Sequence, residues 1–245
     1  MTRPFLIIQL RPEDATADSE FNAIKRYGGL SDDEVQRHRA EVSGLPDIDL
    51  DEFSAVIVGG SPFDVSTPAA EKSEIQQKIE AGFAALFTEI EARDFPFLGA
   101  CSGNGLLGDY CGARISPRYG EPVGIAEIIL TEAGRSDPLL AGLPPTFQVR
   151  LGHKEACDDL PPRTELLAGN AACPVQMFRL KNNIYATQFH PEADQAEFEL
   201  RINVYREFGY FPPATADELI ESLAGIETPE AHEILRRSVA RYRRD

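Results

Sequence analysis

The stretch FPFLGACSGNGLLGDYCGA, residues 95–113, sets an apolar run directly against a glycine-rich turn. The run over 95–100 has the length and hydrophobicity of a strand buried on both faces, and the small residues after it suit a sharp turn into a helix. Cys101 stands at the junction. Because ligands in open α/β sheets bind beyond the carboxyl ends of the strands, a functional side chain is expected at this corner.

Further apolar runs of strand length recur along the chain between turn residues. They are FLIIQL (5–10), AVIVGG (55–60), IAEIIL (125–130), FQVRL (147–151), VQMFRL (175–180) and IYATQFH (184–190). The segment 74–93 has a helical pattern instead, with apolar residues at steps of three and four. These residues are Ile75, Ile79, Phe83, Leu86 and Ile90. The alternation predicts an α/β fold with a mostly parallel sheet and helices on both faces.

The pattern changes to helices alone from about residue 193. The closing stretch PEAHEILRRSVARYR follows a loop that contains Pro212 and Pro213. We therefore expect one α/β domain over 1–208 and a helical C-terminal extension over 209–245 that packs on the same domain. A chain of 245 residues is long enough to bury a large core without disulfide bonds.

Cys101 has two interpretations from its local sequence. The pattern G-x-C-x-G, with Gly99 and Gly103 on either side, is the thiol form of the tight strand-to-helix turn that exposes a nucleophile. At such a turn the helix N-terminus favours negative charge and backbone N–H groups stabilise an oxyanion. The alternative is a buried cysteine that serves as a small apolar side chain. The stretch alone favours neither.

The stretch ATQFHPE, residues 186–192, supplies the partners that a thiol nucleophile needs. His190 ends an apolar run, and Glu192 follows across Pro191, whose fixed φ stiffens the turn. A thiol is activated by a histidine that a carboxylate orients. With Cys101 at another strand end, the pattern favours catalysis over a structural histidine.

The two stretches together resemble the signatures of class I glutamine amidotransferase domains, which are a G-x-C-x-G elbow and a downstream H-P-E. The resemblance covers about residues 1–208. It includes VIVGGSPFDVS (56–66), similar to the family's oxyanion loop, and the segment 149–180, similar to one that precedes H-P-E in the GMP-synthase-like branch. The resemblance implies a flavodoxin-like sheet, with the C-terminal helices as an appendix to it.

The resemblance also implies a role for each matching catalytic position. Cys101 would attack the side-chain amide carbon of glutamine, and His190 would act as general base and then as general acid. Glu192 would orient His190. A glutamyl thioester would form as ammonia leaves, and water would complete the cycle.

The same family pattern implies an oxyanion hole made of backbone N–H groups. One donor would be Ser102. The other would be Gly60 or Ser61, and the alignment does not decide between them.

Three positions depart from the family pattern. Gly105 stands where members usually carry a glutamine that helps to hold the substrate, and Ser102 replaces a bulky residue. Losing one substrate hydrogen bond costs on the order of 1 kcal/mol, so the change at Gly105 weakens binding without abolishing it. His153 and Lys154 stand where the family has His-Gly, and His153 could contact a ligand, although a structural role is favoured.

Composition limits the partners. The net charge of −16 argues against binding of nucleic acid or anionic membranes. The four cysteines form no C-x-x-C pair, so neither zinc ligands nor a secreted disulfide framework is indicated, and a cytoplasmic location without a metal or cofactor is expected. The N-terminal apolar run FLIIQL is far shorter than the roughly 18 residues that a membrane span needs.

The leading hypothesis is a cysteine-dependent glutamine amide hydrolase that supplies ammonia to an unidentified acceptor, with a synthase partner subunit as one possibility. The chain shows no phosphate-binding loop of its own for such a synthase step. Alternatives are a hydrolase of another γ-glutamyl compound and a non-catalytic regulatory module of the same fold. A redox or quality-control protein with a related cysteine turn is disfavoured by H-P-E.

Overall fold

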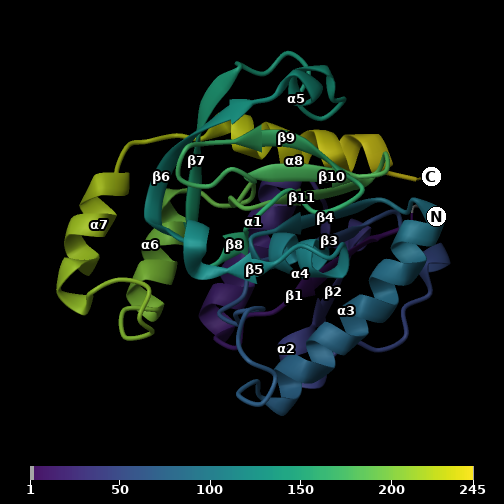
Figure 1. Ribbon diagram of the computed structural model, residues 1–245, viewed down its shortest axis with the longest axis horizontal. Coiled ribbons are helices and arrows are strands. Elements are labelled where there is room, and N and C mark those ends of the chain that lie inside the picture. Colours follow the sequence, from purple (N-terminus) through teal and green to yellow (C-terminus); the bar gives the residue numbers. More distant parts are fainter. Residues whose placement is uncertain (1–2, 245) are drawn as a thin grey trace.

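The computed structural model describes residues 3–244 and contains a nine-stranded sheet with helices on both faces (Figure 1). The predicted α/β fold is confirmed. In spatial order the strands are β2 (Val35–Arg39), β1 (Phe5–Gln9), β3 (Val56–Val58), β4 (Phe97–Ala100), β11 (Ile184–Thr187), β10 (Met177–Leu180), β9 (Thr164–Gly169), β6 (Glu121–Leu130) and β7 (Thr146–His153). A small second sheet pairs β5 (Ile115–Ser116) with β8 (Ala156–Cys157).

The five strands from β2 to β11 run parallel to one another. Their order along the sheet is that of a flavodoxin-like fold, in which ligands bind at the carboxyl ends of the strands. The strands β10, β9, β6 and β7 continue the sheet in antiparallel fashion. The carboxyl ends of β4 and β11 are neighbours, so the corners after them face the same region.

Helices lie on the two faces of this sheet and at one end of the molecule. They are α1 (Asp14–Gly28), α2 (Ala40–Ser43), α3 (Glu74–Arg93), α4 (Ser102–Tyr110), α5 (Glu132–Ser136), α6 (Gln195–Val204), α7 (Ala216–Leu223) and α8 (Pro229–Tyr242). One core cluster joins Leu6 and Ile8 of β1 to the apolar side chains of α3 and α4. The other joins Phe5 and Ile7 to α1 and α8. The alternation along β1 follows from the two-residue period of a strand.

Helix α3 has the predicted bounds. Ser73 caps its N-terminus by accepting a hydrogen bond from the backbone N–H of Gln76 at 3.2 Å. The helix ends at Asp94, whose φ of 47° lies in the left-handed region. Of the predicted apolar stripe, Ile75 is half-buried and the other four residues are buried against the sheet.

The C-terminal part is helical, as expected. Helices α6 and α7 share a small core with the start of β6 and lie at one end of the molecule (Figure 1). Helix α8 packs beside α1, and an isolated bridge pairs Arg3 with Arg244. The division of the chain near residue 208 stays a prediction.

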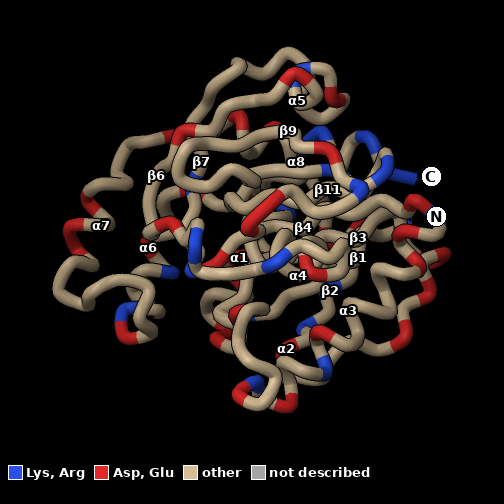
Figure 2. The backbone as a smooth tube through the Cα atoms, in the orientation of Figure 1, with Lys and Arg blue, Asp and Glu red and all other residues tan. Residues whose placement is uncertain are grey.

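Two elements of the parallel half, α1 and β2, lie outside the segments predicted from sequence. Strand β2 has the polar sequence VQRHR and pairs with β1 alone, so its side chains stay half-buried or exposed. Acidic residues are spread along the backbone in every part of the molecule (Figure 2). Within residues 3–244, no helix combines the length and hydrophobicity needed to cross a membrane.

Candidate functional site

Cys101 occupies a strained turn between β4 and α4. Its φ of 53° and ψ of −96° lie outside the regions that side-chain-bearing residues ordinarily adopt. A Cβ atom at Gly99 would lie 2.8 Å from the carbonyl carbon of Gly103, so the turn requires glycine there. The Cys101 N–H donates to the carbonyl of Thr187 at 2.8 Å, which ties this corner to β11. The predicted elbow is therefore formed by the main chain.

His190 lies at the corner that follows β11. Its backbone N–H donates to the carbonyl of Arg150 at 3.0 Å, and its Nδ1 lies 2.7 Å from Oε1 of Glu192. We assign the imidazole proton to Nδ1, because the carboxylate at this distance can only accept a hydrogen bond, and Nε2 is then the basic nitrogen. Cys101 and His190 line the same hollow, so Cys101, His190 and Glu192 lie close together.

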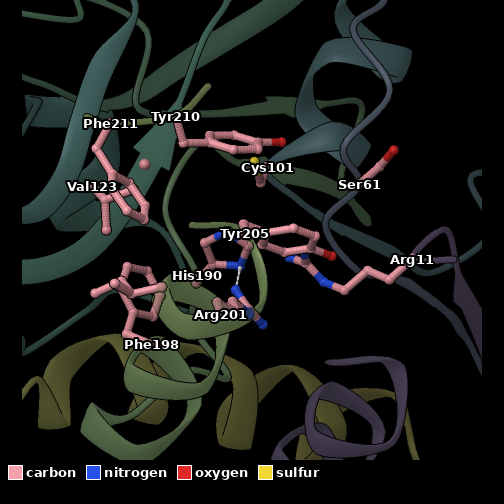
Figure 3. A pocket seen from close by; sticks show the side chains of 12 residues that line it. Arg11, Ser61, Cys101, Val123, His190, Phe198, Arg201, Tyr205, Tyr210 and Phe211 are labelled. Carbon is pink, nitrogen blue, oxygen red and sulfur yellow. Dashed lines mark hydrogen bonds between the residues drawn. The ribbon is translucent and has the colours of Figure 1, made fainter. Parts of the chain in front are cut away.

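Arg201 of α6 supports the His190 corner from behind. Its Nη2 donates to Oε1 of Glu192 at 2.9 Å and its Nε to Oε1 of Glu197 at 2.8 Å. Its Nη1 lies 3.0 Å from Nδ1 of His190 (Figure 3). The arginine therefore fixes the carboxylate that holds the imidazole. All four side chains are buried.

A third buried carboxylate, Glu20 of α1, links the network to the loop after β3. Its Oε1 accepts from Nε of Arg11 at 2.8 Å and from the backbone N–H of Gly60 at 3.0 Å. A Cβ at Gly59 would lie 2.3 Å from Oε2 of Glu20, so any larger residue there would displace this carboxylate from its partners. The N–H of Gly60 is thus engaged, and the next donor along the loop is Ser61.

Protonation of the three central groups follows from their burial and charges. Burial raises the pKa of the Cys101 thiol to about 11, against the opposing charges of Arg11 and Arg201. Burial lowers the pKa of His190, and the Glu192 carboxylate only partly offsets this. Burial alone would raise the pKa of Glu192, but His190 and Arg201 hold it well below its ordinary value. At neutral pH the resting site holds a thiol, a neutral imidazole and a carboxylate.

Two hollows meet at Cys101, and Tyr210 lines both of them. The hollow on the His190 side has apolar walls that include Phe198 and Phe211 (Figure 3). The hollow on the other side is lined by polar and charged groups, among them Lys154. We call them the His190 hollow and the Gly105 hollow.

The remaining predicted site residues lie around the Gly105 hollow. Ser61 lines both hollows, and Ser102 and Gly105 line the Gly105 hollow. A Cβ at Gly105 would meet Val65 at 3.5 Å and Oε1 of Glu155 at 3.8 Å, which are ordinary contacts. Glu155 accepts hydrogen bonds from the backbone N–H groups of Val65 and Ser66 and closes this wall of the hollow.

Both ring nitrogens of His153 have polar neighbours. Nε2 lies 3.0 Å from Oε2 of Glu121, and Nδ1 lies 3.0 Å from the carbonyl of Glu155. These contacts support the structural role that the sequence favours. Among residues 3–244, the ligand atoms of Glu121, His153 and Cys173 lie within 4.8 Å of one another, close enough to hold a metal ion, and all three residues are buried.

Sequence reasoning missed Arg11, Glu20, Arg201, Tyr205 and Tyr210. A signal for two of them exists in the helical pattern. Glu20 follows the buried Thr16 and Ala17 at helical steps, and Arg201 lies between Phe198 and Ile202. A charged residue within an apolar stripe is buried with its helix face, and it then requires a partner of opposite charge.

The sequence matches the family model described as glutamine amidotransferase class-I over residues 17–203. It is 30% identical over 171 residues to the glutamine-hydrolysing GMP synthase of Thermomicrobium roseum, a match that covers 68% of this chain and 29% of that enzyme. It is 27% identical to a subunit of the glutamine-hydrolysing GMP synthase of Pyrococcus abyssi, over 62% of this chain and 73% of that subunit.

Solved structures share the fold over nearly the whole length. A glutamine amidotransferase from Thermotoga maritima has a TM-score of 0.73 at 20% identity, covering 97% of this chain and 96% of its own. A glutamine amido transferase from Methylobacillus flagellatus has a TM-score of 0.73 at 15% identity, covering 99% and 94%. At these identities the likeness concerns the fold alone.

Proposed function

The chain belongs to the class I glutamine amidotransferase family, and from this premise we propose that it hydrolyses the side-chain amide of glutamine through a thioester on Cys101. The observation that carries the proposal is that the turns after β4 and β11 bring Cys101 and His190 to the same hollow. The strained turn at Cys101 opens on the hollow that His190 lines, and Glu192 holds Nδ1 of that histidine.

In the first step the thiol proton passes to Nε2 of His190 as Sγ of Cys101 bonds to the amide carbon. The imidazolium formed is stabilised by Glu192. It then returns the proton to the leaving nitrogen as the C–N bond breaks, which gives ammonia and a glutamyl thioester. A water molecule, deprotonated by His190, attacks the thioester to release glutamate, and the proton returns to the thiol.

The pKa values support a concerted first step. The pKa of Cys101 is raised and that of His190 is lowered, so the resting pair is uncharged and separation of charge begins only as the bond forms. The backbone N–H groups of Ser61 and Ser102 are proposed to bind the oxyanion. Gly60 is the weaker candidate because its N–H donates to Glu20.

The acceptor of the ammonia is proposed from the relatives. The chain spans 29% of the Thermomicrobium roseum enzyme, and the Pyrococcus abyssi relative is named as one subunit of its synthase. When glutamine is the substrate, we propose that a separate synthase subunit takes up the ammonia.

We also propose a cytoplasmic location. All four cysteines are unpaired, which fits the reducing environment of a cytoplasm.

Labelling with 6-diazo-5-oxo-L-norleucine, a glutamine-shaped electrophile, tests the proposal by intact mass. One adduct per chain is expected for the wild type and for Cys111→Ala, and none for Cys101→Ala. Cys111 is the matched control because it is a buried cysteine at the other end of α4. An unlabelled wild type that also fails to hydrolyse glutamine would favour a non-catalytic module.

A further inference from the structure

We propose that the His190 hollow binds the amine part of a γ-glutamyl amide, so that the preferred substrate carries an apolar substituent on its amide nitrogen. The inference rests on the proposed function and names the substrate class of the same site. It is motivated by the unequal chemistry of the two hollows that meet at Cys101.

The direction of the reaction assigns the hollows. His190 gives its proton to the leaving nitrogen, so the leaving amine lies on the side of Cys101 where His190 stands. The acyl part must then extend to the other side. The Gly105 hollow offers Asp64 and Lys154, whose carboxylate and ammonium are 4.0 Å apart, and this pair complements the α-ammonium and α-carboxylate of a glutamyl group.

The His190 hollow is larger than ammonia requires. It has a cavity volume of about 40 Å³ and opens to solvent. A single water needs only about 10–15 Å³ of such volume. The hollow therefore has room for more than ammonia beside the nucleophile, and a longer substituent on the nitrogen extends along the apolar walls toward solvent.

The walls of this hollow select an apolar substituent. Val123, Phe198, Ile202 and Phe211 contribute apolar side chains, and Figure 3 shows Val123, Phe198 and Phe211 together on one side of it. Burying each methylene of a ligand against such walls is worth about 0.8 kcal/mol. The hollow therefore favours an alkyl or aryl amine over ammonia.

Most of the polar groups at the opposite wall are already hydrogen-bonded to other protein side chains. The hydroxyl of Tyr205 lies 3.3 Å from Nη1 of Arg11 and donates to Glu13 at 2.9 Å. Arg201 uses Nε and Nη2 on Glu197 and Glu192. The buried glutamates thus neutralise the charge of the arginines. We therefore expect an uncharged substituent to bind better than one that carries a carboxylate.

The test is a substrate series in which only the amine changes. Hydrolysis is followed as glutamate released from glutamine, γ-glutamylmethylamide, γ-glutamylbutylamide, γ-glutamylbenzylamide and γ-glutamylglycine. We expect kcat/KM to rise along the uncharged series and to be at least tenfold higher for the benzylamide than for glutamine. A preference for glutamine or for γ-glutamylglycine would overturn the inference.

Filling the hollow gives a second readout. Val123→Phe places a ring in the space meant for the amine, and the ratio of benzylamide to glutamine kcat/KM should fall at least fivefold. Ile129→Phe is the matched control, because it introduces the same ring on the same strand at a side chain that is 50% exposed. Should Val123→Phe not fold, Phe211→Ala removes one wall and should lower the same ratio.

The outcomes separate this inference from the proposed function. Hydrolysis of glutamine by a protein that leaves the benzylamide intact overturns the amine site and keeps the amide hydrolase. Hydrolysis of none of the five compounds, with no adduct at Cys101, overturns both. An unchanged ratio in both hollow variants overturns the location of the amine even if the benzylamide is the best substrate.

Discussion

The two corners that form the site are built in different ways. At Cys101 the main chain determines the geometry through a positive φ and a glycine at position 99. At His190 the side chains determine it, because Glu192 and Arg201 hold the imidazole within a buried set of charges. The difference shows that backbone conformation positions the nucleophile, whereas hydrogen bonds between buried side chains position the base.

The largest expected effect comes from Cys101, where activity and stability should move independently. Cys101→Ala and Cys101→Gly should both lose glutamine hydrolysis to below detection. The glycine variant should be the more stable by about 1 kcal/mol, because relief of about 1–3 kcal/mol of backbone strain exceeds the entropic cost of glycine. Urea denaturation of the two variants measures this, and a glycine variant that unfolds at the lower urea concentration would show that the corner carries no such strain.

At the other corner, Glu192→Gln should lower kcat by about a hundredfold or more, because the amide no longer stabilises the imidazolium. Far-ultraviolet circular dichroism checks the fold. Glu197→Gln is the control, since Glu197 binds Arg201 and makes no contact with His190. Equal losses in the two variants would mean that the corner depends on total charge and that the orientation of His190 by Glu192 contributes nothing.

The pH dependence distinguishes the corners without mutation. Burial raises the pKa of the Cys101 thiol from 9.0 to about 11, so below pH 9 its thiolate fraction is about a hundredfold smaller than that of an exposed cysteine. Alkylation of Cys101 by iodoacetamide should therefore accelerate up to about pH 11. Turnover depends instead on neutral His190 as the general base. As the pH rises, turnover should reach its plateau already below pH 6.5, because burial lowers the pKa of His190. Coincident profiles would contradict the concerted step.

The smallest expected effect is at Gly105. Gly105→Gln restores a donor and an acceptor next to the substrate, in a place where a Cβ makes ordinary contacts. One hydrogen bond worth about 1 kcal/mol lowers KM for glutamine about fivefold. Gly105→Leu adds similar bulk without polar atoms, and a matching fall in KM in that variant would assign the effect to helix α4 instead.

The sequence predicted the elements whose pattern is local. Helix α3 repeats apolar residues over 74–93, and the strands of the parallel half that carry long apolar runs are buried on both faces. Strand β2 could not be found in this way, because it lies at the edge of the sheet and its residues are polar. Its pairing with β1 depends on the rest of the fold.

The same limit applies to the site. Cys101, His190 and Glu192 stand in short motifs, so their candidacy follows from sequence. Glu20 and Arg201 carry charges that single-residue preferences place on the surface. Arg201 pairs with Glu197 one helical turn earlier, a spacing that the sequence contains. Its contact with Glu192, and the contact of Glu20 with Arg11, form only when the separate elements pack together in the fold.

Tyr210 stands where the two hollows join, in a chain with seven tyrosines and no tryptophan. A Tyr210→Trp variant would therefore contain a single indole, located beside the nucleophile, against an otherwise silent background. Because that ring would face both hollows, its emission would respond to the arrival of the acyl group and to the departure of the amine as separate events. Fluorescence from this one position would thus report the order in which substrate binds to the two hollows and product leaves them.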